Sequence, residues 1–296
     1  MKILLIIPYF GTTPAWFNFF LKSSSLNSQI TWLLYGDLPE PKSLPKNIIF
    51  HYSSIKEFSE LVSNKLAVTI DLSNPYKICD FRPAFGKIFE DYTIDYDFWG
   101  YSDLDIIYGD ISTFIPLDKI DKYDIIASRN DYYPGHFMLF KNNNENKFLF
   151  KKIFRYSGIL EDTKRHYAID ERSNLIGKAF EGVEIPTLSR KILYKVLRVL
   201  PFNHDLNTVL SKVSGKDKNR ILRLNNSIRS DYFYMKKGVD NWEVEWKDGK
   251  LYDMIEKREL MYFHFLKSKN NLKIKSVDFK AVSSFKINKK AIHLNK

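Results

Sequence analysis

Residues 98–111 read FWGYSDLDIIYGDI, and two aspartates in this stretch, Asp103 and Asp105, point to the fold. The apolar, aromatic run before them has the composition of a buried strand. Side chains two residues apart on a strand point the same way, so where the chain bends both carboxylates can converge on one cation. Mg²⁺ and Mn²⁺ prefer oxygen ligands and commonly hold a diphosphate through one or two carboxylates. The stretch predicts a metal site at a strand end; the alternative is a solvated acidic turn.

The rest of the first half alternates between strand-like and helix-like segments. The expected strands cover residues 2–8, 30–35, 48–52, 124–128 and 136–140, and the expected helices cover residues 14–25, 54–67, 75–91, 144–157 and 168–180. This alternation predicts the α/β class, with a mostly parallel sheet and helices on both faces. Ligands of such sheets bind at the carboxyl ends of the strands, where Pro8, Asp37 and Asp103 would lie.

The composition is that of a folded chain with ample material for a core. Of the 296 residues, 44% are hydrophobic and 16% are aromatic, which suits one large domain or a domain with an elaboration. The single cysteine, Cys79, excludes an internal disulfide. Residues 1–10 lack the features of a signal peptide, and no apolar run reaches the ~18 residues of a membrane span. We therefore expect a cytoplasmic protein.

The net charge of +11 is unevenly distributed and divides the chain into three parts. Residues 1–186 carry 21 basic and 24 acidic residues, a net of −3, and form the expected metal-binding core. Residues 187–237 carry 12 basic and three acidic residues, a net of +9. Residues 238–296 would return to the active site and end in a basic tail. The asymmetry points to an anionic partner surface.

The basic part is expected to be a helical elaboration. Apolar residues from Leu188 to Leu200 mix there with the basic residues Arg190, Lys191, Lys195 and Arg198. Such an amphipathic pattern suits a helix that lies on an anionic membrane. It suits equally well a helix that packs on the protein's own core and exposes a solvated basic face.

Four segments, 6–11, 76–86, 102–111 and 261–267, resemble bacterial glycosyltransferases of the GT-A fold. The nearest likeness is to polysaccharide-biosynthesis proteins (capsule, O-antigen) of the glycogenin and lipopolysaccharide galactosyltransferase type. The resemblance implies a Rossmann-like sheet with flanking helices and an Asp-x-Asp metal site. It covers residues 1–180 and, locally, 255–270, and it leaves the basic part unmatched.

The resemblance also implies roles for individual residues. Asp103 and Asp105 would hold Mn²⁺ or Mg²⁺, with His264 as third ligand, although a histidine between aromatic residues is often a core residue. The residues that would contact the nucleotide-sugar are Pro8, Tyr9, Phe10, Asp37, Lys77, Asp80, Arg82, Ser102 and Lys267. The open alternatives are an ion pair for Lys77 and Asp80 and a turn-forming role for Asp37.

A catalytic carboxylate is expected from Asp170 or Glu171, within the stretch His166 to Arg172. An inverting enzyme of this fold uses such a group to accept the acceptor's hydroxyl proton, a contribution of roughly 10²–10⁴-fold. The alternative is structural, because acidic residues also stabilise the start of a helix.

These observations predict a glycosyltransferase that moves a hexose from a UDP-sugar to a glycan on a lipid carrier. It would be peripheral on the inner face of the cell membrane and would bind no nucleic acid. Two rivals remain. A nucleotidyltransferase acting on sugar phosphates usually needs a glycine-rich loop, and residues 8–13 contain only Gly11. A nucleic-acid-binding protein would interleave aromatics with its basic residues, but here the aromatics concentrate in the front half.

Overall fold

The computed structural model describes residues 1–130, 132–171, 209–210, 220–225, 227–269, 272–275 and 277–294. Two expectations fall largely outside these residues: the helix at 168–180 beyond Glu171, and the basic segment 187–237 up to residue 219. Within the expected helix, residues 168–171 form a turn.

A seven-stranded sheet forms the centre of the described structure, with the strand order β3-β2-β1-β4-β7-β6-β8. Only β7 runs antiparallel to its neighbours, β4 and β6. This confirms the α/β class and the mostly parallel sheet. The strands are β1 (Ile3–Tyr9), β2 (Ile30–Gly36), β3 (Ile48–Tyr52), β4 (Phe98–Ser102), β6 (Ile125–Ala127), β7 (Phe137–Lys141) and β8 (Ile221–Arg223).

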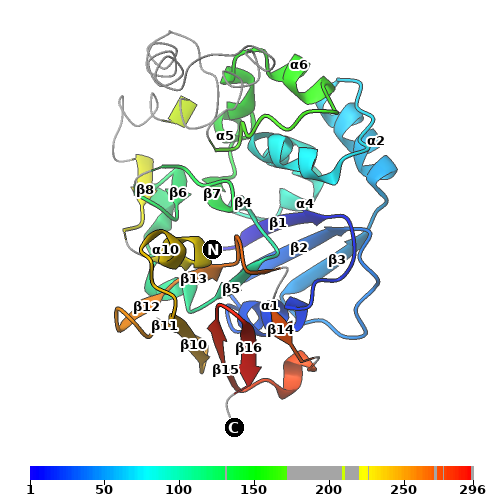
Figure 1. Ribbon diagram of the computed structural model, residues 1–296. Helices are drawn as coiled ribbons and strands as arrows, with labels where there is room; N and C mark the ends of the chain where they lie inside the picture. Colours follow the sequence, from blue (N-terminus) through cyan, green and yellow to red (C-terminus); the bar gives the residue numbers. More distant parts are fainter. Residues whose placement is uncertain are drawn as a thin grey trace, which may run out of the picture.

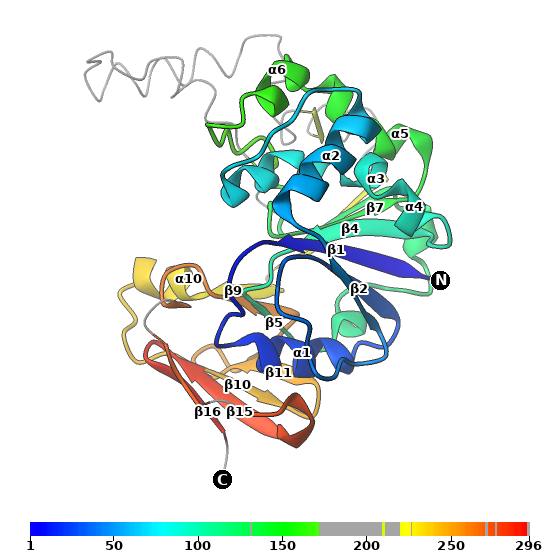
Figure 2. The same cartoon turned by 90° about the vertical axis from the view of Figure 1, so that its right-hand side faces the viewer.

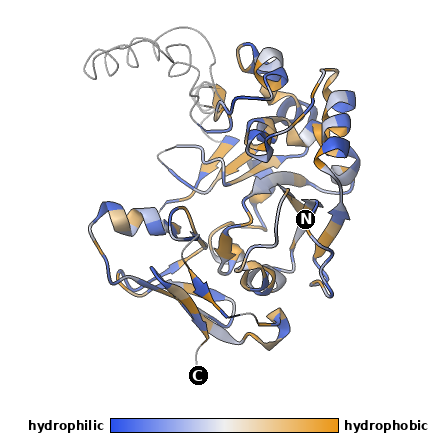
Figure 3. Cartoon of the chain, turned by 45° about the vertical axis from the view of Figure 1, so that its right-hand side comes forward, coloured by the Kyte–Doolittle hydropathy of each residue, from blue (hydrophilic) through white to orange (hydrophobic). Residues whose placement is uncertain are grey.

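Side chains of β1 alternate between the two faces of this sheet. Leu4 and Ile6 pack beneath the helices that cover one face, whereas Ile3, Leu5 and Ile7 pack on the other face, where α1 lies (Figure 1). Both faces are buried along β1, β2, β4, β6 and β7, so these strands are mostly apolar, whereas the edge strand β3 is largely exposed. Figure 3 shows the apolar residues of the central strands in orange. The α-helices are α1 (Phe17–Ser25), α2 (Ile55–Leu66), α3 (Phe85–Ile88), α4 (Glu90–Thr93), α5 (Asn144–Lys147), α6 (Tyr156–Glu161) and α10 (Asp231–Lys236).

Two expected long helices are broken into short pieces. Residues 75–91 form the 3₁₀ helix η1 (Pro75–Ala84) followed by α3 and α4, because Pro83 lacks the N–H that a continuous α-helix needs. Residues 144–157 divide into α5, η4 (Leu149–Lys152) and the start of α6. The other described 3₁₀ helices are η2 (Ile111–Thr113), η3 (Ile120–Lys122) and η7 (Phe279–Ala281).

The C-terminal part consists mainly of strands. A six-stranded sheet has the order β12-β11-β10-β15-β16-β14, and a three-stranded sheet has the order β5-β13-β9. Figure 2 shows α1 between the central sheet and the six-stranded sheet. The strands are β5 (Ile106–Tyr108), β9 (Ile228–Ser230), β10 (Glu243–Lys247), β11 (Lys250–Asp253), β12 (Arg258–Leu260), β13 (Tyr262–His264), β14 (Lys273–Ile274), β15 (Ser284–Asn288) and β16 (Ala291–Leu294).

The expectation of a wholly helical basic segment is wrong for its described residues. Residues 221–230 contain β8 and β9, and only the short α10 follows. Both strands form because they pair with distant strands, β8 with β6 and β9 with β13. Among the helices that the structure describes, none is long and apolar enough to cross a bilayer.

The order of the central strands determines where a ligand can bind. The chain runs from β1 outward to β2 and β3, and then crosses to β4 on the other side of β1. The carboxyl ends of β1 and β4 therefore flank the point where the strand order reverses. In open α/β sheets this point is the usual ligand site.

Candidate active site

The chain bends immediately after β4, and the bend carries Asp103 and Asp105. The Asp103 N–H donates to the His136 carbonyl at 3.2 Å, so β7 holds one side of the bend. The Trp16 indole N–H donates to the Leu104 carbonyl at 3.0 Å, just before α1. Two elements thus fix both carboxylates at the carboxyl end of the sheet.

Strand β13 brings His264 to the same place. It pairs with β5 so that His264 lies opposite Ile106, and the next N–H, of Phe265, donates to the Asp105 carbonyl at 2.9 Å. The Nε2 of His264 is 3.1 Å from Asp105 Oδ1 and 3.6 Å from Asp103 Oδ2. The structure therefore brings the three predicted metal ligands together.

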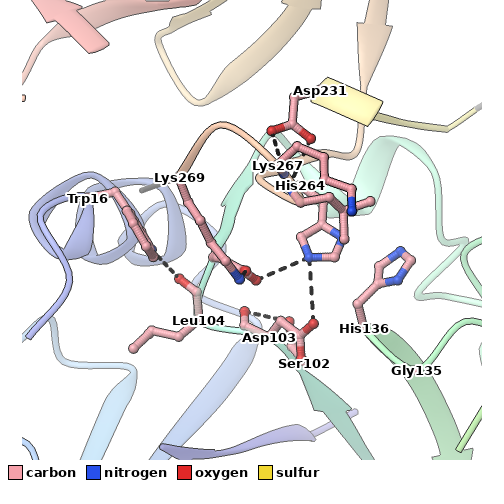
Figure 4. A network of polar contacts seen from close by, with 12 residues as sticks. Trp16, Ser102, Asp103, Leu104, Gly135, His136, Asp231, His264, Lys267 and Lys269 are labelled. Carbon is pink, nitrogen blue, oxygen red and sulfur yellow. Dashed lines mark hydrogen bonds and ion pairs between the residues drawn. The ribbon is translucent and has the colours of Figure 1, made fainter. Parts of the chain in front are cut away.

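Two cations flank these carboxylates. Arg82 forms an ion pair with Asp103, and Lys269 Nζ lies 2.6 Å from Asp105 Oδ2. Figure 4 shows Lys269 and His264 beside the bend that carries Asp103. Burial opposes ionisation of Asp105, yet His264 and Lys269 hold its pKa well below the usual range. Burial also lowers the pKa of His264, but Asp105 outweighs it and the net shift is upward.

The donor set fits a hard divalent cation. One ligand atom from each of Asp103, Asp105 and His264 lies within 4.8 Å of the others. Asp105 Oδ1 is buried and has no hydrogen-bond partner among the described residues, although the His264 ring faces it. Two carboxylates and an imidazole around such an oxygen suit Mn²⁺ or Mg²⁺.

A buried carboxylate organises the loop between His264 and Lys269. Asp231, 1% exposed, accepts from the backbone N–H groups of Leu266 (2.9 Å), Lys267 (2.9 Å) and Ser268 (2.6 Å). It also accepts from the Ser268 hydroxyl at 2.6 Å. Because the loop wraps around this single group, Asp231 sets the positions of the residues at both of its ends.

The two predicted catalytic carboxylates have different surroundings. Arg82 donates to Asp170 at 2.9 Å, and Asp170 is 3% exposed. Burial raises the pKa of Asp170 to about 7 in spite of this arginine. Glu171 accepts from the Gly135 N–H at 2.9 Å and lies 3.9 Å from His136 Nδ1. Burial opposes ionisation of Glu171, but these contacts hold its pKa at about 2.

The predicted nucleotide contacts at the end of β1 lie near the bend. Pro8, Tyr9 and Phe10 are half-buried at the carboxyl end of this strand. Burial and then the charge of Asp105 raise the pKa of Tyr9, which places this side chain in the field of the candidate metal site. Asp37 accepts from the Gly11 N–H at 2.6 Å and so ties the loop after β1 to the end of β2.

Three other predicted contacts are engaged inside the protein. The Ser102 hydroxyl is buried and bonds to the Tyr108 hydroxyl. Lys77 and Asp80 form a fully buried ion pair at 2.9 Å, and Asp80 also accepts from the N–H of Tyr167 at 2.8 Å. This pair ties η1 to the segment that leads into Asp170.

A second cluster, Asp80, His166 and Asp170, is also close enough to hold a metal ion. Both oxygens of Asp80 are used by the fold, however, because Asp80 accepts from Lys77 and from the N–H groups of Tyr167 and Ile169. The cluster therefore supports the active-site segment and is a poorer candidate for a cation.

The sequence reasoning missed three residues of this site. It selected Lys267, whose side chain is exposed, whereas Lys269 makes the contact with Asp105. The two lysines are separated by one residue, so the local pattern could have indicated either. His136, with its ring 4.5 Å from that of His264, and Asp231 had no local signal, because distant strands bring them there.

Comparison with protein families gives one match, to the family described as "Family of unknown function (DUF6625)", over residues 5–296. The chain belongs to this family. No curated protein sequence matches the chain.

Solved structures give distant likenesses. Mouse xyloside xylosyltransferase 1 in its apo form has 10% identity and a TM-score of 0.38, over 88% of this chain and 97% of that one. Galactosyltransferase LgtC in complex with donor and acceptor sugar analogues has 10% identity and a TM-score of 0.34, over 89% and 87%. Glycosyltransferase GlyE of Streptococcus pneumoniae TIGR4 has 11% identity and a TM-score of 0.35, over 90% and 55%. These likenesses are too distant to indicate a function for the DUF6625 protein.

Proposed function

We propose that this DUF6625 protein is a metal-dependent glycosyltransferase that moves a hexose from a UDP-sugar to a glycan acceptor. One observation carries the proposal: Asp103, Asp105 and His264 converge at the carboxyl edge of a mostly parallel sheet, at the reversal of strand order. A metal ion at this edge would bind the diphosphate of a nucleotide-sugar, and the nucleoside would lie beside the carboxyl end of β1.

Asp103, Asp105 and His264 would hold Mn²⁺ or Mg²⁺. Such an ion, when bound, neutralises the charge that develops on a leaving diphosphate. Lys269 is the cation that would face the diphosphate from the loop after β13. The residues that would border the nucleoside are Pro8, Tyr9, Phe10 and Asp37. Arg82 would fix the position of Asp103 relative to Asp170, because it forms an ion pair with each.

For an inverting reaction we assign the general base to Glu171. Its contacts keep Glu171 ionised at neutral pH but also make it a weak base, so the assignment rests on access to the acceptor and not on the pKa. The Glu171 side chain is also 40% exposed, against 4% for Asp170, so it can reach an acceptor hydroxyl. Asp170 then serves as the buried partner of Arg82.

We further propose that the acceptor is carried on a lipid, in surface polysaccharide synthesis of the capsule or O-antigen kind. The basic residues Arg190, Lys191, Lys195 and Arg198 support attachment to an anionic membrane surface, at ~1 kcal/mol per side chain. The protein should sediment with anionic liposomes at low salt. The combined substitutions Arg190→Glu, Lys191→Glu, Lys195→Glu and Arg198→Glu should abolish sedimentation with liposomes and leave donor hydrolysis unchanged. If the unmodified protein does not sediment with anionic liposomes at low salt, the proposed membrane attachment is wrong.

The test of the central proposal measures Mn²⁺ binding and hydrolysis of a panel of UDP-hexoses. Asp103→Asn and Asp105→Asn should each abolish hydrolysis and weaken Mn²⁺ binding by about 100-fold, while the protein stays folded. Asp110→Asn is the matched control, because Asp110 lies in the same stretch but only caps η2 through Ser112. Near-normal activity of both site variants with Mn²⁺ present would refute the proposal.

A further inference from the structure

A pocket of about 820 Å³ opens beside the loop that follows β13. Its walls come from α10, from the start of β10, from the turn between β15 and β16, and from Lys267 and Ser268 of that loop. The volume is within the range of sites for small organic ligands. It is far more than an inorganic anion needs, since one water takes ~30 Å³ of liquid volume.

The pocket and the candidate metal site share one wall. Residues 266–268 are wrapped around Asp231, which also lines the pocket. The same loop ends at His264 on one side and at Lys269 on the other, and both of these side chains reach Asp105. A ligand in the pocket would therefore lie against the loop that positions the metal-site residues.

The unpaired charge of the pocket is positive. The carboxylate oxygens of Asp231 are buried and already accept four hydrogen bonds from the loop. The other two carboxylates are in ion pairs, Asp240 with Lys289 at 2.6 Å and Glu243 with Lys286 at 2.7 Å. Lys267 and Lys290 are exposed, and none of the described carboxylates pairs with either ammonium group. Two cations are thus available to a ligand.

The remaining polar lining suits hydroxyl groups. The exposed amide of Asn241 supplies a neutral donor and an acceptor. Asn288 supplies its amide N–H groups, because its Oδ1 accepts from the N–H groups of Lys290 and Ala291. We propose that the pocket binds the acceptor as a saccharide that carries an anionic group, a carboxylate or a phosphate, with Lys290 and Lys267 as its counter-charges. This inference rests on the proposed glycosyltransferase function.

Met235 provides a direct probe, because it lines the pocket and is 51% exposed. The protein carries only five methionines, so ¹³C-methyl spectra resolve them, and Met235→Leu assigns the signal. The probes are glucuronate, galacturonate and glucose 6-phosphate, with glucose, galactose and inorganic phosphate as matched neutral and inorganic ligands. The anionic sugars should shift the Met235 signal saturably, at millimolar concentrations, and the matched ligands should not.

Lys290→Gln should weaken this binding about tenfold, as expected for loss of a charge-assisted hydrogen bond. Lys42→Gln, at an exposed lysine that does not line the pocket, should leave binding unchanged. Absence of a shift with every anionic sugar, or equal shifts with the neutral sugars or with phosphate alone, would overturn the inference. Mn²⁺ binding and donor hydrolysis by the unmodified protein are measured independently of the Met235 signal, so failure of the pocket and failure of the proposed function are separable.

Discussion

The ammonium group of Lys269 lies 2.6 Å from Oδ2 of Asp105, although 164 residues separate the two in the chain. Asp105 is buried, and Lys269 is its nearest permanent counter-charge. The same lysine therefore competes with a metal ion for Asp105 and is available to a diphosphate.

We expect Lys269→Gln to change two affinities in opposite directions. Without nucleotide, Mn²⁺ affinity should rise about 3- to 10-fold because a like charge is removed from beside the site. With Mn²⁺ present, UDP affinity should fall about tenfold because a charged donor is lost. Isothermal titration calorimetry measures both. Lys286→Gln is the matched control, because the Lys286 side chain is about as exposed as that of Lys269 and pairs with a carboxylate outside the metal site, Glu243. Unchanged Mn²⁺ and UDP affinities in Lys269→Gln would show that this lysine has no role in the site.

A second prediction concerns the loop around Asp231. Asp231→Asn leaves one acceptor oxygen for three N–H groups and a hydroxyl, so the loop should loosen and Mn²⁺ affinity should fall about 10- to 100-fold. Asp278→Asn tests the general effect of the same substitution, because Asp278 caps η7 at a distance from the site. If both variants bind Mn²⁺ normally while folded, the loop is positioned by something other than Asp231.

A third prediction uses a glycine. A Cβ on Gly135 would overlap Asp170 Oδ2 and lie 2.8 Å from Glu171 Cγ. Gly135→Ala should therefore displace the segment with the proposed base and lower turnover at least tenfold, with Mn²⁺ affinity retained. Gly158→Ala is the control, since nothing lies within 4 Å of the added methyl group. Normal turnover of Gly135→Ala would argue against a role for these carboxylates.

A fourth prediction concerns pH and Asp170. Burial raises its pKa from 3.8 to about 7, so the folded protein favours the protonated form. That contribution to stability is complete below the ordinary pKa and is lost as the pH rises through about 7. The unmodified protein should therefore lose stability relative to Asp170→Asn between about pH 4 and pH 7. Urea denaturation at several pH values measures the difference. Asp118→Asn is the control, because Asp118 is exposed, and its effect on the free energy of unfolding should not change with pH. If the difference in unfolding free energy between Asp170→Asn and the unmodified protein is the same at every pH, the prediction is wrong.

The central sheet could be predicted because its signals are local. Each predicted strand of the first half is present, since apolar runs buried on both faces are legible in the sequence alone. The segment from 75 to 91 is broken around Pro83, a residue that the sequence alone marks as a candidate break or kink, whereas the helix predicted from 144 to 157 is broken without such a local signal. Both segments have the apolar spacing of a helix, but a proline in the first and tertiary packing in both limit how long each helix is.

The site divides in the same way. Asp103 and Asp105 could be selected as candidate ligands because they follow a recognisable strand, and His264 because a short motif surrounds it. The sequence could not show that Lys269 rather than Lys267 reaches Asp105. Nor could it show that Lys77 and Asp80 are buried against each other, because burial depends on segments more than 80 residues away.

The sequence by itself determined the α/β class, the mostly parallel order of the first strands and the acidic pair at the end of β4. These depend on side-chain periodicity and on chemistry within a few residues. Only the tertiary structure decided that β8 and β9 interrupt the basic segment, and that Asp231, His136 and Lys269 surround the candidate metal site. Pairing between strands far apart in the chain brings these residues together, and its stability comes from surface buried between the strands, which no local pattern records.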